Sequence, residues 1–143
     1  MDLKFRKKYA SLDSCVILRI IQGDILEQKR SAINLLLDGR EYYVDDTAIL
    51  ECAYVLSKDH TPRAKIAEDL SVFLRNSMIH YNKSFFKDIF RDYLSHPSLS
   101  MEDLVLAKRA AETGRTPLYT FDKKFARQSK VAELVPSASN QQE

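Results

Sequence analysis

The segment PLYTFDKKF, residues 117–125, joins a β-prone run to a short basic helix. Residues 118–121 contain the aromatic and β-branched side chains that are frequent in strands. Asp122 stands where the strand gives way to the helix, a position that suits a helix N-cap or a ligand-binding acid. The segment therefore predicts a strand that feeds a helix, with a carboxylate at the junction.

The same alternation runs along the rest of the chain. Short β-prone runs predict further strands at residues 9–13, 42–44, 78–81 and 131–135. Apolar residues grouped at helical spacing predict helices at residues 16–21, 25–37, 49–56, 62–74, 83–94 and 101–112. Thr61 is expected to cap the fourth of these helices, with Pro62 as its first residue, and Ser100 to cap the sixth.

This alternation predicts a parallel sheet, because parallel neighbours need the crossover connections that the helices supply. We expect an α/β fold, a three-layer α/β/α domain with a central parallel sheet of four to five strands. The single domain should span residues 1–135, and the polar residues 136–143 should form a disordered tail. In such sheets ligands bind beyond the carboxyl ends of the strands, so functional residues are sought there.

The composition is that of a globular cytoplasmic domain. A chain of 143 residues can bury roughly two thirds of its unfolded surface without help from a disulfide. No apolar run reaches the roughly 20 residues of a membrane span, and the N-terminus lacks the apolar core of a secretory signal. Cys15 and Cys52 have apolar neighbours and are expected in the core. The isolated His60, His80 and His96 are expected in loops or on the surface.

Several carboxylates are expected at one edge of the sheet. Asp13, Asp46 and Asp122 each follow a predicted strand. Glu51 lies on the helix after Asp46, about one and a half turns along, and can point back over that edge. Asp103 is in the first turn of the helix before the fourth strand. Carboxylates without histidine or cysteine form an all-oxygen site, which suits Mg²⁺ or Mn²⁺.

Each acid also has a structural explanation. Asp46 and Asp122 can be plain N-caps, and Asp13 can be a turn residue. The sequence Ser100-Met-Glu-Asp103 resembles a capping box with aspartate in place of glutamate. Only the combination of these acids favours a functional site.

Basic residues are concentrated between residues 104 and 130, where seven basic side chains accompany two acidic ones. Such a cluster can bind phosphates. The structural alternative is a solvated helix face. The seven are Lys108, Arg109, Arg115, Lys123, Lys124, Arg127 and Lys130.

Four motifs occur here in the order seen in PIN domains. They are Leu12-Asp13-Ser14, Glu51 followed by Val55-Leu56, Asp103-Leu-Val-Leu-Ala107, and Thr120-Phe-Asp122-Lys-Lys-Phe125. From about Tyr9 to Val135 the chain resembles PIN-domain proteins of the VapC-like toxin ribonuclease family. It differs from the family's pattern at Ser14, where threonine is common, and at Cys15, where asparagine is usual.

The resemblance implies a metal-dependent endoribonuclease, the toxin of a toxin-antitoxin pair, that acts on RNA with Mg²⁺ or Mn²⁺. It implies a homodimer that is held inactive by a protein antitoxin. The catalytic and metal-binding residues would be Asp13, Glu51, Asp103 and Asp122, with Glu102 as a weaker substitute for Asp103. Ser14 and Thr120 would support them, and RNA would bind to Lys108, Lys123, Lys124 and Arg127.

Other functions fit less well. A phosphatase of the haloacid dehalogenase kind needs a second aspartate two residues after the first, but Cys15 stands there. A response-regulator receiver needs its acidic pair after the first strand, whereas Asp45 and Asp46 follow the second. The main alternative is a catalytically impaired PIN-like module that binds RNA or protein.

Overall fold

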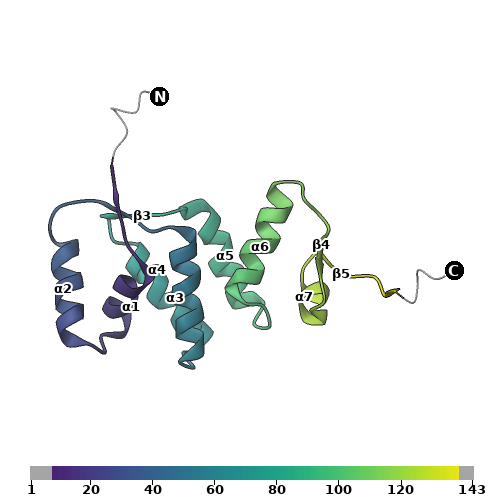
Figure 1. Cartoon of the computed structure of the whole chain (residues 1–143), viewed down its shortest axis with the longest axis horizontal. Coiled ribbons are helices and arrows are strands. Elements are labelled where there is room, and N and C mark those ends of the chain that lie inside the picture. Colours follow the sequence, from purple (N-terminus) through teal and green to yellow (C-terminus); the bar gives the residue numbers. More distant parts are fainter. Residues whose placement is uncertain (1–7, 139–143) are drawn as a thin grey trace. The chain divides into compact units, whose positions relative to one another are not determined.

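The computed structural model describes residues 8–138 of the chain (Figure 1). The chain divides into two compact units, an N-terminal unit that ends at Lys87 and a C-terminal unit that begins at Asp88. That residues 1–135 form a single domain stays a prediction. Residues 1–7 and 139–143, which include most of the predicted disordered tail, lie outside the described residues.

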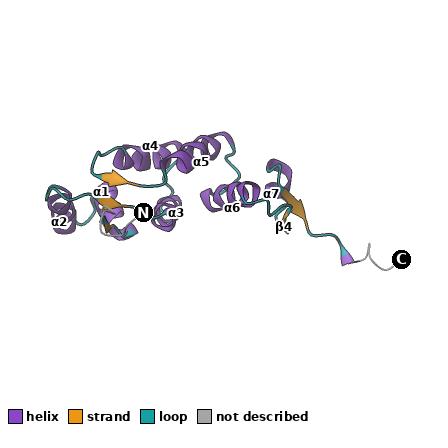
Figure 2. Cartoon of the chain, turned by 90° about the horizontal axis from the view of Figure 1, so that it is seen from above, coloured by secondary structure: helices purple, strands orange, loops and turns teal. Residues whose placement is uncertain are grey.

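The N-terminal unit alternates short strands with helices, as the sequence predicts. Figure 2 shows helix α4 along one side of its strands. The elements are β1 (Ala10–Ser11), α1 (Ser14–Gln22), α2 (Leu26–Leu36), β2 (Tyr42–Tyr43), α3 (Asp46–Lys58), α4 (Arg63–Leu74), β3 (Ile79–His80) and the first part of α5 (Lys83–Ser95).

The C-terminal unit continues the same alternation. It contains the second part of α5, then α6 (Met101–Glu112), β4 (Leu118–Thr120), α7 (Lys123–Gln128) and β5 (Ala132–Leu134). Every strand and helix predicted from the sequence is therefore present, with bounds that differ by a few residues.

The strands form two parallel sheets. In the N-terminal unit the order is β1-β2-β3, with Ser11 opposite Tyr43 and Tyr43 opposite His80. In the C-terminal unit β4 pairs with β5. The expectation of one sheet with four to five strands is wrong for the strand count, because among residues 8–138 the main sheet has three strands. A β-prone run predicts that a strand exists but not which strand it pairs with.

The N-terminal unit is held together by α1, which packs against α2, α3 and α4. Ile17, Ile49, Ile66 and Leu70 from these helices are almost completely buried. Each such side chain contributes roughly 1.5–3 kcal/mol when it is removed from water. These contacts fix the faces of α1 and α3, the two helices that carry the first acids of the predicted site.

The buried Tyr42 fixes the second strand against the loop that precedes it. Its hydroxyl donates a hydrogen bond at 2.8 Å to Oδ2 of Asp38, and its oxygen lies 3.0 Å from the carbonyl of Leu35. The aromatic ring is 1% exposed, so the polar end of the side chain is paired and the apolar body packs in the core.

Helix caps agree with the sequence in part. Ser100 and Asp103 form the predicted capping box at the start of α6. At α4 the N-cap is Pro62 rather than Thr61, and at α3 it is Asp45 rather than Asp46. In both helices the observed cap is one residue away from the predicted one. The sequence alone does not locate a helix end to within one residue, because neighbouring residues can both act as caps.

Two expectations about burial are wrong. Cys15 is exposed, whereas Cys52 is buried as predicted. His80 is in strand β3 and half-buried, where its Nε2 lies 3.0 Å from Oε1 of Glu41 and its ring stacks on Tyr9. None of the helices in the described residues is long and apolar enough to cross a membrane.

Candidate metal centre

Asp13 and Glu51 are brought together by Ser14. Asp13 follows β1 and caps α1, and its Oδ1 accepts a hydrogen bond of 2.7 Å from the backbone N–H of Ser14. The Ser14 hydroxyl is 2.7 Å from Oε2 of Glu51 and 3.3 Å from Oδ1 of Asp13. A hydroxyl has one proton, so we assign it to the shorter contact with Glu51. The predicted supporting role of Ser14 thus has a physical basis, a link between two carboxylates.

The negative charge of this pair affects the pKa of the neighbouring Cys52. Burial raises the pKa of the Cys52 thiol to about 12, and the charges of Glu51 and Asp13 add to the shift. Its Sγ lies 3.7 Å from the carbonyl oxygen of Ser14, within reach of a weak S–H hydrogen bond. The thiol therefore stays protonated and fills space beneath the acids. Asp13 and Glu51 themselves are exposed, so solvent and ions can reach them.

The acids after β2 have a structural role in the N-terminal unit. Oδ2 of Asp45 accepts hydrogen bonds from the backbone N–H and the hydroxyl of Thr47, at 2.9 and 2.6 Å. Asp46 occupies the first turn of α3, where a negative charge suits the helix dipole. Burial, followed by the charges of Asp46 and Asp45, raises the pKa of Tyr43. The sequence offered Asp46 as a plain N-cap. In the structure Asp45 is the N-cap, and Asp46 contributes negative charge to the first turn of α3.

Asp103 and Asp122 are in the C-terminal unit, each at the start of a helix. Oδ2 of Asp103 accepts a 3.3 Å hydrogen bond from the backbone of Ser100, whose hydroxyl accepts one of 3.1 Å from Asp103. Oδ1 of Asp122 accepts hydrogen bonds from the backbone N–H groups of Lys124 and Phe125, at 2.9 and 3.1 Å. In both cases the cap uses one carboxylate oxygen, which leaves the other for a ligand.

Thr120 orients Asp122. Its Oγ1 accepts a 3.0 Å hydrogen bond from the backbone N–H of Asp122. Strand β4 ends at Thr120 and α7 begins at Lys123, so this bond holds the turn between the two elements. The supporting role predicted for Thr120 stays a prediction; the observed hydrogen bond joins Thr120 to the backbone of Asp122 and not to its carboxylate.

The donor chemistry of these residues fits a hard divalent cation. All available donors are carboxylate or hydroxyl oxygens, which suit Mg²⁺ and Mn²⁺. Asp13 and Glu51 lie in the N-terminal unit, and Asp103 and Asp122 in the C-terminal unit. Across residues 8–138, no group of three or more metal-ligating side chains is placed to hold an ion. That the four acids act together stays a prediction.

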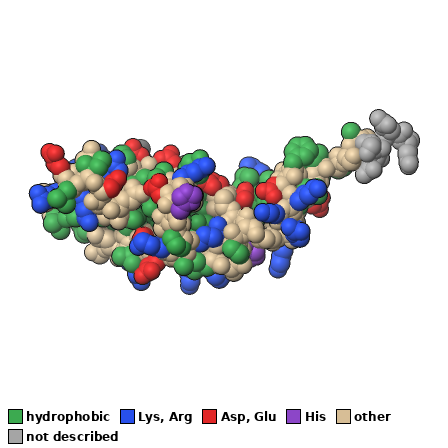
Figure 3. All heavy atoms as spheres, turned by 90° about the horizontal axis from the view of Figure 1, so that it is seen from below, with side chains coloured by type: hydrophobic (Ala, Val, Ile, Leu, Met, Phe, Trp, Pro, Cys, Tyr) green, Lys and Arg blue, Asp and Glu red, His purple; other side chains and the backbone are tan. Residues whose placement is uncertain are grey.

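Among the basic residues predicted to bind RNA, one is paired with acids and the others are exposed on α7. Nζ of Lys108 is 3.0 Å from Asp88 and 2.8 Å from Glu112, and hydrogen bonds to both carboxylates raise its pKa. Lys108 is thus already neutralised and is a poorer phosphate ligand than predicted. Lys123, Lys124 and Arg127 on α7 are exposed. Figure 3 shows Lys and Arg side chains gathered on the part of the chain that leads to the C-terminal tail.

One comparison with known proteins finds a match. The model of the family described as PIN domain matches residues 10–131, which is most of the chain. No curated protein and no solved structure was found to match. The matched range begins in β1 and ends just before β5, so it includes all four predicted acids.

Proposed function

Because this chain belongs to the PIN-domain family, we propose that it is a metal-dependent endoribonuclease of the VapC-like toxin type. PIN domains have a three-layer α/β/α fold, so the fold class predicted from the sequence is confirmed. PIN domains are generally nucleases that use divalent metal ions. To this general activity the proposal adds two points, that the substrate is RNA and that the protein acts as a toxin.

The observation that carries the proposal is the contact between Ser14 and two acids far apart in sequence. The hydroxyl lies within hydrogen-bonding distance of both Asp13 and Glu51, which are contributed by different elements. Like charges held this close repel each other unless a cation lies between them. A fold that keeps both carboxylates exposed and adjacent is better suited to bind a cation than to gain stability from them.

We assign the residues the following roles. Asp13, Asp103 and Asp122 would ligate Mg²⁺ or Mn²⁺ directly, and Glu51 would act through a water or a second ion. The bound ion would supply the Lewis acidity that activates water and neutralises charge on the phosphodiester. Ser14 and Thr120 would orient the acids as described above. Lys123, Lys124 and Arg127 would hold the phosphates of the RNA, with a smaller contribution from Lys108.

The decisive test is cleavage of a panel of RNAs by Asp13→Asn and Asp103→Asn, with Mn²⁺ or with chelator. An amide keeps the shape and can still accept the capping hydrogen bond, but it removes the anionic metal ligand. Both variants should lose cleavage and remain folded by circular dichroism. Glu102→Gln, in the same helical turn as Asp103, is the matched control. Normal cleavage by Asp13→Asn, or loss of cleavage only in Glu102→Gln, contradicts the assignment.

The alternative is a catalytically impaired module that keeps the fold and binds RNA or protein. It predicts that RNA binding is unaffected by metal and by Asp13→Asn. Binding measured beside cleavage on the same RNA panel separates the two functions.

A partner protein is part of the proposal, and its chemistry follows from the acids. An arginine can bridge two carboxylates bidentately and so replace the cation between them. A protein antitoxin with an arginine or a basic tail would then compete with metal, and its inhibition should weaken as Mn²⁺ is raised. As a toxin of this type the protein would act in the cytoplasm as a homodimer, which sedimentation analysis can test.

A further inference from the structure

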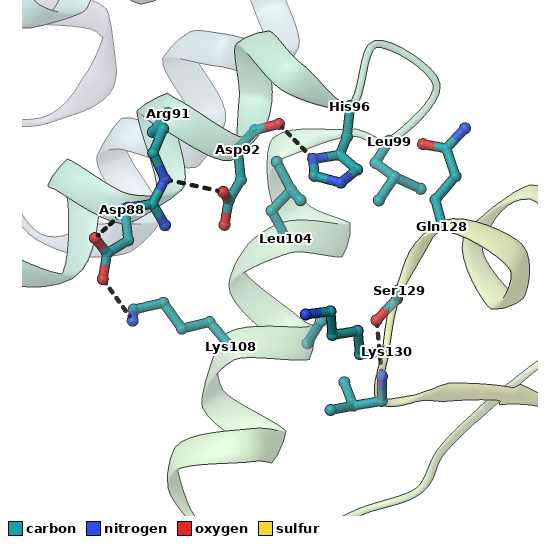
Figure 4. Close-up of a pocket in the computed structure, with 12 residues that line it drawn as sticks. Asp88, Arg91, Asp92, His96, Leu99, Leu104, Lys108, Gln128, Ser129 and Lys130 are labelled. Carbon is teal, nitrogen blue, oxygen red and sulfur yellow. Dashed lines mark hydrogen bonds and ion pairs between the residues drawn. The ribbon is translucent and has the colours of Figure 1, made fainter.

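The C-terminal unit contains a cavity of about 410 Å³ that none of the proposed catalytic residues lines (Figure 4). It is formed by the end of α5, one face of α6 and the link between α7 and β5. Pockets of roughly 300–1,000 Å³ are typical of small-molecule sites. The volume is therefore sufficient for one nucleotide.

A buried polar atom in this cavity lacks a partner. Oε1 of Gln128 is buried and makes no hydrogen bond with any described residue. In Figure 4 the Gln128 amide lies across from Leu99, with its oxygen on the side of that residue. A buried acceptor without a donor has lost its hydrogen bonds to water without gaining any in return, which is unfavourable. A ligand that offers an N–H group would remove this cost.

The charges around the cavity leave one cation unneutralised. Arg91 pairs with Asp88 and Asp92, both at 3.3 Å, and Lys108 pairs with Asp88 at 3.0 Å. The carboxylates that line the cavity are thus already matched by cations. Lys130 is exposed and has no ion pair with a described residue. The cavity therefore favours a ligand with an anionic group at the Lys130 side.

The remaining walls are largely apolar. Leu99, Leu104 and Val131 line the cavity, and His96 adds an imidazole, one of the side chains on which bases stack. A ligand that fits must have a flat body, an N–H donor for the amide and an anion for Lys130. A dicarboxylate or a fatty acid lacks the donor, and a free amino acid would leave most of the volume empty.

We propose that this cavity binds an adenine nucleotide, with the base edge on the Gln128 amide and the phosphate on Lys130. Adenine presents the N6 donor beside the N7 acceptor, the pair that a glutamine amide binds bidentately. The nucleotide can be free or can be an adenosine within RNA. Only the second source rests on the proposed function, for which the cavity would be a base-specific subsite.

The first experiment measures binding of AMP, GMP, CMP and UMP to the full chain by calorimetry, in chelator. AMP should bind best. Gln128→Leu should weaken AMP binding about tenfold or more, since the loss of one bidentate contact to a base has an effect of that order. The same variant should melt about 2–4 °C higher without ligand, because it removes a buried unpaired acceptor. Gln22→Leu, which changes a partly exposed glutamine in the N-terminal unit, is the control and should bind AMP normally.

A second variant tests the phosphate end. Lys130→Met should weaken AMP binding but leave adenosine binding unchanged, whereas Lys87→Met on the exposed side of α5 should change neither. Absence of AMP binding, equal binding of all four nucleotides, or normal AMP binding by both Gln128→Leu and Lys130→Met overturns the proposal.

The source of the nucleotide is decided by competition. If the site binds an adenosine within RNA, an oligouridine with one central adenosine should displace AMP, and an all-uridine oligomer should not. Displacement by neither oligomer assigns the site to a free nucleotide. Because these measurements need no metal and no cleavage, a protein that binds AMP but cuts no RNA refutes the proposed function and leaves the nucleotide site standing.

Discussion

The substitution Ser14→Ala removes the hydroxyl that links Asp13 to Glu51 and leaves both acids in place. Alanine favours helix more than serine does, and Ser14 is the first residue of α1, so the fold should persist. Without the hydroxyl the two carboxylates lose their shared contact and Glu51 is free to turn into solvent. We expect Ser14→Ala to bind Mn²⁺ more weakly and to cleave RNA more slowly.

The magnitude follows from the contact. A hydrogen bond to a charged group contributes about 1.5–3 kcal/mol, and about 1.4 kcal/mol corresponds to a tenfold change in affinity. Glu51 is exposed, so water replaces part of the lost bond and the smaller value applies. We therefore expect Mn²⁺ affinity to fall about tenfold, at the lower end of the roughly 10–100-fold found when residues that orient metal ligands are removed.

Calorimetric titration with Mn²⁺ and cleavage at several Mn²⁺ concentrations measure the effect. A positioning role predicts that high Mn²⁺ restores most of the cleavage and that Ser14→Thr, which keeps the hydroxyl, retains it. Ser57→Ala is the matched control, because its hydroxyl donates a 2.7 Å hydrogen bond to Tyr54 on the same helix as Glu51. Mn²⁺ affinity of Ser14→Ala within twofold of the wild type would show that the link between the acids has no part in metal binding.

The remaining predictions concern the basic helix and the thiols. Charge reversal of the basic residues of α7, by Lys123→Glu, Lys124→Glu and Arg127→Glu, should weaken RNA binding. The slope of log affinity against log salt concentration should fall by about 0.7 per lost phosphate contact. Fluorescence anisotropy at several salt concentrations measures this slope, and an unchanged slope indicates a solvated face. A thiol reagent should modify the exposed Cys15 and spare the buried Cys52 in the native protein, so mass spectrometry that finds both labelled equally contradicts the packing. The free energy of unfolding should fall as pH rises above 9.0, because the Cys52 pKa is about 12 when folded and the unfolded chain releases the proton first; urea titrations of wild type and Cys52→Ala should differ in this slope.

Much of the local structure follows from neighbours in the chain. The strand and helix that meet at Asp122 are both present, and its N-cap role appears as the sequence suggested. The capping box of Ser100 and Asp103 is likewise local, since its hydrogen bonds join residues three apart. Such features depend on backbone groups within one turn, and residue type alone specifies them.

Burial was harder to predict. Cys15 and Cys52 have similar apolar neighbours, but Ser14, Ile17 and Leu18 form the buried face of α1 and Cys15 falls on the other side. The side of a helix that faces the core depends on what packs against it, here α2, α3 and α4. In the same way His80 is partly buried because its strand pairs with β2, beside Glu41.

The candidate site shows the same division. The sequence by itself determined the alternation of strands and helices, the acids at their junctions and the all-oxygen chemistry of those acids. Only the tertiary structure decided that Ser14 contacts Glu51, 37 residues away, that Lys108 is neutralised by two carboxylates, and that Gln128 has a buried acceptor without a donor. The physical reason is that capping and propensity act within a few residues, whereas contacts between distant side chains depend on which surfaces the whole fold buries together.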